Sequence, residues 1–205
     1  MISTVISDLG RVILWFDNKI FFRKMTAYCS LTEEKIREIV HKNSEFIELF
    51  DTGKITPQEF HSRAIAKLDA RIGYKEFFAA YTDVFSSNPA VLDILDKLKG
   101  KYRLILLSNT DVIRFAFIKS KFPEILIFDD YVLSFEVGYM KPHPEIYKEA
   151  LKRAGAEAPE AVFIDDMEEN IIGAKALGLK GILYKPDTDL EKELRDSGLS
   201  LIKRE

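Results

Sequence analysis

Side chains able to do chemistry recur in this sequence where short apolar runs end. They are Asp8, Ser108, Asn109, Lys141, Asp165 and Asp166. Carboxylates packed together repel one another unless a cation lies among them, and hard oxygen ligands of this kind suit Mg²⁺. A hydroxyl, a backbone N–H at a helix start and a lysine ammonium are groups that bind phosphate. An aspartate nucleophile in such surroundings predicts phosphoryl transfer.

Each of these residues also has an ordinary interpretation when it is taken alone. Asp8 suits a turn, Ser108 suits a helix N-cap, and Lys141 suits an exposed loop. The chemical interpretation therefore depends on whether the fold brings all of them to one place.

The strands and helices that would position these residues can be predicted from the spacing of apolar residues and from the turn and capping residues between them. Apolar runs of strand length occur at residues 2–7, 103–108, 131–134, 161–165 and 180–184. Helical patterns lie between the last four of these runs, at residues 109–121, 144–154 and 168–177. Strands alternating with helices predict a parallel α/β sheet with right-handed crossovers. Since ligands bind at the carboxyl ends of such strands, all the candidate residues are expected at one edge of the sheet.

The interval between the first two strands is unusually long, at about 95 residues. Its last part, residues 88–100, is predicted to be one crossover helix with Asn88 as N-cap and Pro89 at the first position. The rest shows no convincing strand and several amphipathic helices. Two of these begin at predicted capping boxes, Ser30 with Glu33 and Thr56 with Glu59.

The predicted fold class is therefore α/β, with a Rossmann-like parallel sheet and a small all-helical domain inserted after the first strand. We expect residues 1–15 and 88–205 to form the sheet core and residues 16–87 to form a helical cap. Aromatic residues at helical spacing in the insert predict a packed helix interface and not a ligand site. They are Tyr74, Phe77, Phe78, Tyr81 and Phe85.

Composition excludes several other classes of protein. The 205 residues contain 30 Lys and Arg against 33 Asp and Glu, with the two signs interspersed, so no basic surface for nucleic acid is expected. The longest apolar run, residues 12–16, is far shorter than the roughly 18 residues that span a bilayer, so no membrane partner is expected. The single cysteine, Cys29, and the lack of a signal-like start predict a cytoplasmic protein.

At the candidate residues the sequence resembles the haloacid dehalogenase-like superfamily, over essentially the whole chain. Its four motifs appear in order as Asp8-Leu9-Gly10, Leu107-Ser108-Asn109-Thr110, Gly138-Tyr139-Met140-Lys141-Pro142-His143-Pro144 and Phe163-Ile164-Asp165-Asp166. The resemblance implies a Rossmann-like core with a mobile helical lid over the active site.

The resemblance also implies a role for each matching residue. Asp8 is similar to the nucleophile that becomes a transient aspartyl phosphate, and Lys141 to the cation that holds this aspartate and the phosphate. Ser108 and the backbone N–H of Asn109 resemble the phosphate-binding groups. The implied ligands of Mg²⁺ are Asp8, the backbone carbonyl of Gly10, and Asp166. Asp165 would bind the metal through water or orient Asp166, and Asn170 would support the fourth motif.

One position departs from the family pattern. Most phosphatases of this superfamily carry a second aspartate two residues after the nucleophile, as the acid and base for the leaving group, and here that position is Gly10. Losing such a group costs on the order of 10² to 10⁴ in rate. Asp17 and His143 are candidates to deliver the proton, although Asp17 also suits a helix start and His143 a turn. Four residues at the entrance to the insert are expected either to shape the substrate pocket or to pack at the hinge: Arg11, Trp15, Phe16 and Asp17.

From these observations we expect a Mg²⁺-dependent phosphatase acting on a small phosphorylated metabolite, with sugar phosphates as the first candidates. Sugar phosphates that lose an anomeric oxygen are the least affected by a missing acid. Two alternatives stay open. One is a phosphometabolite-binding protein that has lost turnover through Gly10. The other is a haloacid dehalogenase, which needs no metal and is disfavoured by the Asp165-Asp166 pair.

Overall fold

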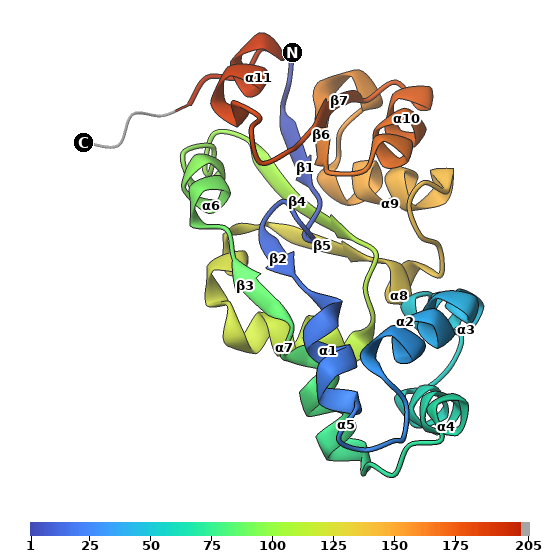
Figure 1. Cartoon of the computed structure of the whole chain (residues 1–205). Helices are drawn as coiled ribbons and strands as arrows, with labels where there is room; N and C mark the ends of the chain where they lie inside the picture. Colours follow the sequence, from blue (N-terminus) through green and yellow to red (C-terminus); the bar gives the residue numbers. More distant parts are fainter. Residues whose placement is uncertain (202–205) are drawn as a thin grey trace.

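A computed structural model of the chain, which describes residues 1–201, contains a five-stranded parallel sheet (Figure 1). The strand order is β5-β4-β1-β6-β7. The strands are β1 (Thr4–Ser7), β4 (Arg103–Ser108), β5 (Asp130–Leu133), β6 (Ala161–Asp165) and β7 (Lys180–Leu183). The predicted strands are thus confirmed to within two residues at each end, and the Rossmann-like α/β fold is confirmed with them.

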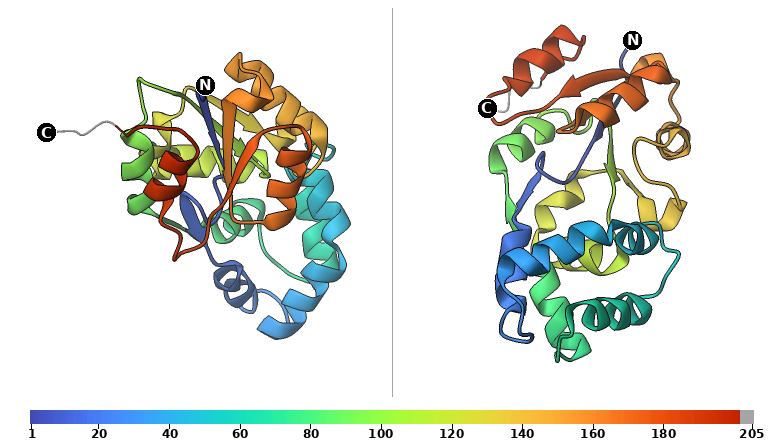
Figure 2. Two further views of the ribbon diagram at one scale, coloured as in Figure 1. Left: turned by 90° about the horizontal axis from the view of Figure 1, so that it is seen from above. Right: turned by 45° about the vertical axis from the view of Figure 1, so that its right-hand side comes forward.

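Helices cover both faces of the sheet, as the view from above shows (Figure 2). They are α6 (Pro89–Asp96), α7 (Val112–Lys121), α8 (Ser134–Val137), α9 (Pro144–Ala154), α10 (Glu168–Ala176) and α11 (Leu190–Asp196), with 3-10 turns η1 (Pro123–Ile127) and η2 (Ala158–Glu160). Successive strand residues point to opposite faces. On β4, Leu104 and Leu106 therefore join one hydrophobic cluster, and Ile105 and Leu107 join another.

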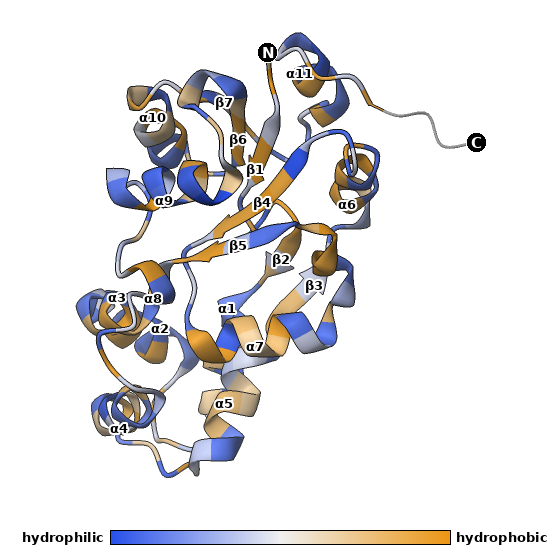
Figure 3. Cartoon of the chain, turned by 180° about the vertical axis from the view of Figure 1, so that it is seen from behind, coloured by the Kyte–Doolittle hydropathy of each residue, from blue (hydrophilic) through white to orange (hydrophobic). Residues whose placement is uncertain are grey.

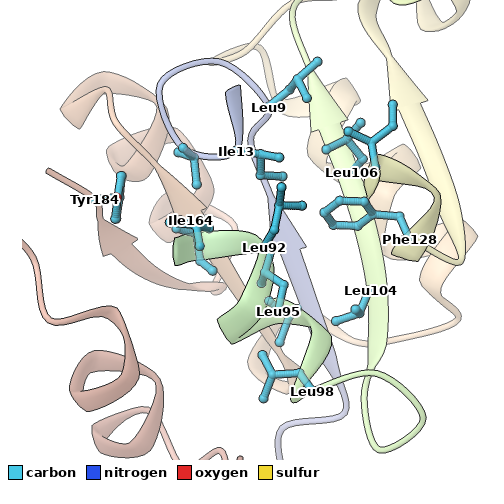
Figure 4. Packing of buried hydrophobic residues seen from close by; sticks show 14 of the residues in the cluster. Leu9, Ile13, Leu92, Leu95, Leu98, Leu104, Leu106, Phe128, Ile164 and Tyr184 are labelled. Carbon is cyan, nitrogen blue, oxygen red and sulfur yellow. The ribbon is translucent and has the colours of Figure 1, made fainter. Parts of the chain in front are cut away.

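The first of these clusters packs helix α6 against the sheet. Leu92 and Leu95 of α6 lie beside Leu104 of β4 and Ile164 of β6 (Figure 4). Strands β4 and β6 are apolar along most of their length because both of their faces are covered (Figure 3). Burial on both sides fixes the register of the strands, and with it the position of the residues at their carboxyl ends.

Within the long interval after β1, residues 18–82 fold into five helices, which lie together at the lower end of the molecule in Figure 1. They are α1 (Asn18–Met25), α2 (Glu33–Lys42), α3 (Ser44–Asp51), α4 (Pro57–Leu68) and α5 (Tyr74–Thr82). They share a hydrophobic cluster that includes Phe77, Phe78 and Tyr81, with Tyr74 packed against it. The predicted aromatic helix interface is confirmed for these four, whereas Phe85 packs against the cluster from a strand. Within the cluster Phe50 stacks on Phe60 at a ring-centroid distance of 4.3 Å.

Two local predictions for this interval were wrong. The chain enters and leaves the helices through a two-stranded antiparallel ribbon, β2 (Leu14–Phe16) with β3 (Phe85–Ser87), where no strand was expected. Strands of three residues are too short to show a periodic pattern, and this pair joins segments far apart in the sequence. Helix α2 is capped by Thr32, whose hydroxyl accepts from the Lys35 N–H, and not by Ser30. The second predicted capping box, Thr56 with Glu59, is confirmed.

The five helices contact the sheet core through a group of polar side chains that we call the junction. Its members are Asn18, Asp51 and Tyr81 on α1, α3 and α5, and Thr110, Asp111, Arg114 and Ser134 around α7 and α8. The Tyr81 hydroxyl donates to Asp111 Oδ2 at 2.8 Å. Asp51 Oδ1 is buried with no hydrogen-bond partner among the described residues. One guanidinium, Arg114, therefore faces two carboxylates.

Because two carboxylates face one guanidinium, the stability of the protein is expected to depend on pH through Asp51. Burial and the nearby Asp111 carboxylate, opposed by Arg114, raise the pKa of Asp51 to about 7. Because the pKa in the folded protein lies above that of an unfolded chain, the ionised form costs stability, and the cost grows as pH rises from about 4 to about 7. The free energy of unfolding of Asp51→Asn, taken relative to that of the wild type, is therefore expected to rise by about 1 to 2 kcal/mol from pH 5 to pH 8.

Urea unfolding at the two pH values measures this gain. Glu45→Gln, which removes an exposed carboxylate from the same helix, is the control and should show a difference from wild type that is the same at both values. A difference for Asp51→Asn that stays equally constant with pH would contradict the prediction.

Within residues 1–201, no helix is both long and apolar enough to cross a membrane.

Candidate active site

The carboxyl ends of β1 and β6 bring two aspartates together around one lysine. Asp8 directly follows β1, and its N–H donates to the carbonyl of Ile164 on β6 at 2.8 Å. The Lys141 ammonium lies 2.6 Å from Asp8 Oδ1 and 2.7 Å from Asp165 Oδ2. Its side chain is only 2% exposed, and it also donates to the carbonyl of Leu107 at the end of β4. Three neighbouring strands thus converge on this ammonium.

The loop that carries Lys141 is held in place by Asn109. The side-chain amide of Asn109 donates to the Lys141 carbonyl at 3.0 Å, and its oxygen accepts from the Lys141 N–H at 2.8 Å. Sequence reasoning had assigned only the backbone N–H of Asn109, to phosphate. It missed the side-chain role because the partner lies 32 residues away in an irregular loop.

Asp165 is fully buried and its oxygens are occupied. It accepts from Lys141, from the Met167 N–H at 2.8 Å, and from the amide of Asn170 at 2.9 and 3.1 Å. Asn170 is itself held in place, because its backbone carbonyl accepts a hydrogen bond from the hydroxyl of Tyr147. These contacts make Asp165 a residue that orients Lys141 and the loop, and they leave its neighbour Asp166 facing the cavity.

A cavity of about 350 Å³ lies in front of Asp8. Its walls are Asp8, Gly10, Arg11, Phe16, Asn109, Lys141, Asp166, Met167 and Asn170. Most of the predicted site residues therefore share one cavity. Ser108, the last residue of β4, has a buried side chain next to Asn109 in the sequence.

The site carries more negative than positive charge. Burial raises the pKa of Asp8 to about 7, although Lys141 lowers it, and Asp165 adds to the rise. Burial and Asp165 raise the pKa of Asp166, against the lowering effect of Arg11. Burial would lower the pKa of Lys141, but the two carboxylates more than offset this and raise it. Oxygens of all three aspartates lie within 4.8 Å of one another, an arrangement that favours a bound cation.

The space beside Gly10 is filled by an aromatic ring. A Cβ built on Gly10 would lie 3.1 Å from the ring of Phe16, and the guanidinium of Arg11 lies 5.2 Å from the centre of the same ring. Arg11 has a φ of 58°, a left-handed conformation that is strained for a residue with a side chain. The ring of Phe16 thus lies against the position where the side chain of a second aspartate would begin.

The two candidate proton donors lie in different places. Asp17 is exposed and caps α1 by accepting from the Lys19 N–H at 2.9 Å. His143 caps α9, where its Nδ1 accepts from the Glu145 N–H, and its ring stacks on Tyr139 at 4.3 Å. The structure places only His143 in a hollow that Lys141 also lines, between α3 and the loop 138–143.

The parallel Rossmann-like sheet thus carries a buried Asp–Lys–Asp group at its carboxyl edge, which is where ligands bind in α/β enzymes. The model of the haloacid dehalogenase-like hydrolase family matches residues 13–178, which is well over half of the sequence. The chain belongs to this family and is a hydrolase.

Several relatives of this chain are named as phosphatases. A D-ribitol-5-phosphate phosphatase of Bacteroides thetaiotaomicron is 26% identical over 201 residues, covering 95% of this chain and 97% of the relative. A sesquiterpene phosphatase of Aspergillus oryzae is 30% identical over 146 residues, covering 68% of this chain and 72% of the relative.

A similar solved structure holds ligands. It is that of a family enzyme from Bacteroides thetaiotaomicron in complex with magnesium and inorganic phosphate, with a TM-score of 0.83 and 29% identity, covering 95% of this chain and 100% of that one.

Proposed function

We propose that the protein is a Mg²⁺-dependent phosphoric monoester hydrolase that acts on a small phosphorylated metabolite through an aspartyl phosphate at Asp8. The observation that carries the proposal is the contact of buried Lys141 with both Asp8 and Asp165, while Asp166 lines the same cavity. A carboxylate nucleophile, a buried cation and a second free carboxylate are the groups that phosphoryl transfer needs.

The donor set fits a magnesium ion. Asp8, Asp166 and the carbonyl of Gly10 would hold it, because Asp165 already accepts hydrogen bonds from Lys141, Met167 and Asn170. Hard carboxylate oxygens with room left for water and a phosphate oxygen match the preference of Mg²⁺. When bound, the ion would neutralise negative charge and orient the phosphate. The magnesium and phosphate complex of the Bacteroides thetaiotaomicron enzyme supports this assignment.

Asp8 would attack phosphorus with Oδ2, because Oδ1 is bound to Lys141. A bond forms between this oxygen and phosphorus while the ester bond to the leaving oxygen breaks. The Ser108 hydroxyl, the Asn109 N–H and the Lys141 ammonium would bind the phosphoryl oxygens. Water then attacks the phosphorus of the aspartyl phosphate, releasing inorganic phosphate and restoring Asp8.

Substrates whose leaving group needs little protonation suit this site best, because Gly10 has no acidic side chain. Sugar phosphates that leave through an anomeric oxygen are of this kind. The D-ribitol-5-phosphate phosphatase supports a polyhydroxylated substrate class. For other leaving groups we propose His143 as the donor, since it lines the same hollow as Lys141.

We also propose that residues 16–87 act as a cap over a core of residues 1–15 and 88–205. Helix α3 of the insert and the loop 138–143 form the walls of a hollow of about 640 Å³ that Lys141 also lines. A cap in this position would surround the leaving group and exclude bulk water during transfer.

Purified protein assayed against a panel of sugar phosphates and p-nitrophenyl phosphate, with Mg²⁺ and with EDTA, tests the proposal. We expect inorganic phosphate to be released in the presence of Mg²⁺. In EDTA the rate should be lower by about 100-fold or more. Halide release from haloacids that persists in EDTA would instead favour a dehalogenase.

One observation favours a second candidate, a phosphometabolite-binding protein. Gly10 carries no acid, and a Cβ at this position would lie only 3.1 Å from the ring of Phe16. Binding of one panel member with no hydrolysis of any would establish that function and overturn the enzymatic one.

A further inference from the structure

The phosphate-binding segment continues directly into the junction. Ser108 and Asn109 are followed by Thr110 and Asp111, and both of these later residues are buried. Each of the two is tied to the helical insert by its own set of hydrogen bonds. The segment that would hold phosphate is therefore connected to the helices α1–α5 at two consecutive positions.

The first connection runs through Ser134, the fully buried first residue of α8. Its hydroxyl accepts from the Thr110 N–H at 2.9 Å, and its single proton faces the carbonyls of Asp51 at 2.6 Å and Thr110 at 3.0 Å. Asp51 is the last residue of α3. The loop that follows α3 lies so close to α8 that a Cβ on Gly53 would be only 2.3 Å from the Phe135 carbonyl. Helix α3 cannot shift at this point without changing the contacts of Thr110.

The second connection runs through Asp111. Its Oδ1 accepts the N–H groups of Ile113 and Arg114 at the start of α7, and its Oδ2 accepts the hydroxyl of Tyr81 at 2.8 Å. The guanidinium of Arg114 lies 4.0 Å from the centre of the Tyr81 ring. The side chain of Asp111 thus links the beginning of α7 to helix α5 of the insert.

Asn109 lies between these connections and the catalytic lysine. Its side chain holds the backbone of Lys141 through two hydrogen bonds, while its neighbours in the sequence are tied to the insert. Displacement of the insert would pull on Thr110 and Asp111 and, through Asn109, on the phosphate-binding N–H and Lys141. No atom of Tyr81 needs to touch the substrate for this effect.

We propose that Tyr81 is a positioning residue that, with Ser134, couples the docking of the helical insert to the geometry of the phosphate-binding segment 108–111. Docking of the insert favours phosphate binding, and bound phosphate favours docking by the same factor, because coupling between two sites is reciprocal. This inference rests on the proposed phosphate site but not on turnover there.

Tyr81→Phe tests the proposal, because it removes one hydroxyl and keeps the ring that packs in the insert. The measured quantity is the dissociation constant of inorganic phosphate in the presence of Mg²⁺, by calorimetry, well below the melting temperature of each variant. We expect phosphate to bind about five- to twenty-fold more weakly, the lower part of the range of roughly five- to 150-fold that is usual for coupled sites. Hydrogen exchange in α3 and α5 should slow when phosphate binds to the wild type, and slow less in the variant.

The matched control is Tyr131→Phe. The Tyr131 hydroxyl donates to the Ile125 carbonyl at 3.2 Å, a partly buried hydrogen bond away from the junction. This variant should bind phosphate as the wild type does, even if its melting temperature falls.

Each outcome separates the inference from the function. A lower melting temperature for Tyr81→Phe with an unchanged dissociation constant would show a merely structural role and overturn the coupling. Weaker phosphate binding in a protein that hydrolyses nothing would support the coupling and refute the phosphatase. A wild type that binds no phosphate with Mg²⁺ would overturn both.

Discussion

Asp8→Asn is expected to abolish phosphate release while the protein stays folded. An amide is nearly the same size as the carboxylate but cannot attack phosphorus to form an acyl phosphate, and loss of a nucleophile costs on the order of 10⁴-fold or more in kcat. The change also removes one of two carboxylates around Lys141, leaving the ammonium paired with Asp165 at 2.7 Å. A buried pair with balanced charge remains, so thermal stability should be unchanged or higher.

The measurement is phosphate release from p-nitrophenyl phosphate with Mg²⁺, together with a melting curve. Asp17→Asn is the control, because Asp17 is an exposed carboxylate nearby in the sequence and asparagine is equally good at a helix N-cap. Its rate should lie within about twofold of wild type. The nucleophile assignment fails if Asp8→Asn keeps its activity. A large loss in Asp17→Asn would instead identify Asp17 as the missing acid.

The parts of this molecule that could be predicted from sequence are those set by local periodicity. Five strands and their carboxyl ends follow from short apolar runs, because a parallel strand buried on both faces must be apolar along its length. That rule alone brings Asp8 and Asp165 near one another, because β1 and β6 are neighbours. The ribbon of β2 and β3 escaped prediction because three residues are too few to show a period.

Contacts between distant loops could not be predicted in the same way. The reciprocal hydrogen bonds of Asn109 with Lys141 join two irregular segments, and nothing in either segment indicates the other. The Tyr81 hydroxyl reaches Asp111 from 30 residues away. An aromatic residue at helical spacing indicates a packed core. The hydrogen-bond partner of the Tyr81 hydroxyl could not be predicted without knowing that α5 packs beside α7.

The acidic pair Asp165-Asp166 illustrates the limit most clearly. Adjacent carboxylates in a sequence indicate a cation site without saying which one faces it. The structure separates them, because Asp165 points to Lys141 and Asn170 while Asp166 lines the cavity. The same side chain that looks like a metal ligand in sequence is thus a support for the lysine, and this division makes Lys141 the centre of the site.

Lys141→Met is accordingly expected to damage both the fold and the chemistry. It leaves the carboxylates of Asp8 and Asp165 buried together without their cation, and breaking a buried ion pair by removing one partner costs about 3 to 5 kcal/mol. The pKa of Asp8, already raised to about 7 by burial, rises further when the lowering effect of Lys141 is lost. At neutral pH the nucleophile is then protonated, and the phosphate loses a charged donor.

We therefore expect kcat/KM to fall by about 10³-fold or more at pH 7, with part of the loss recovered as pH rises and Asp8 ionises. Rates measured between pH 6 and pH 9, together with urea unfolding, separate the two effects. Lys97→Met is the control, since Lys97 forms a surface ion pair with Glu191 at 2.6 Å. Breaking that pair should cost no more than about 1 kcal/mol and leave the rate unchanged. If Lys141→Met kept the wild-type pH profile, the lysine would not be what keeps Asp8 ionised, and the bound cation would have to do so alone.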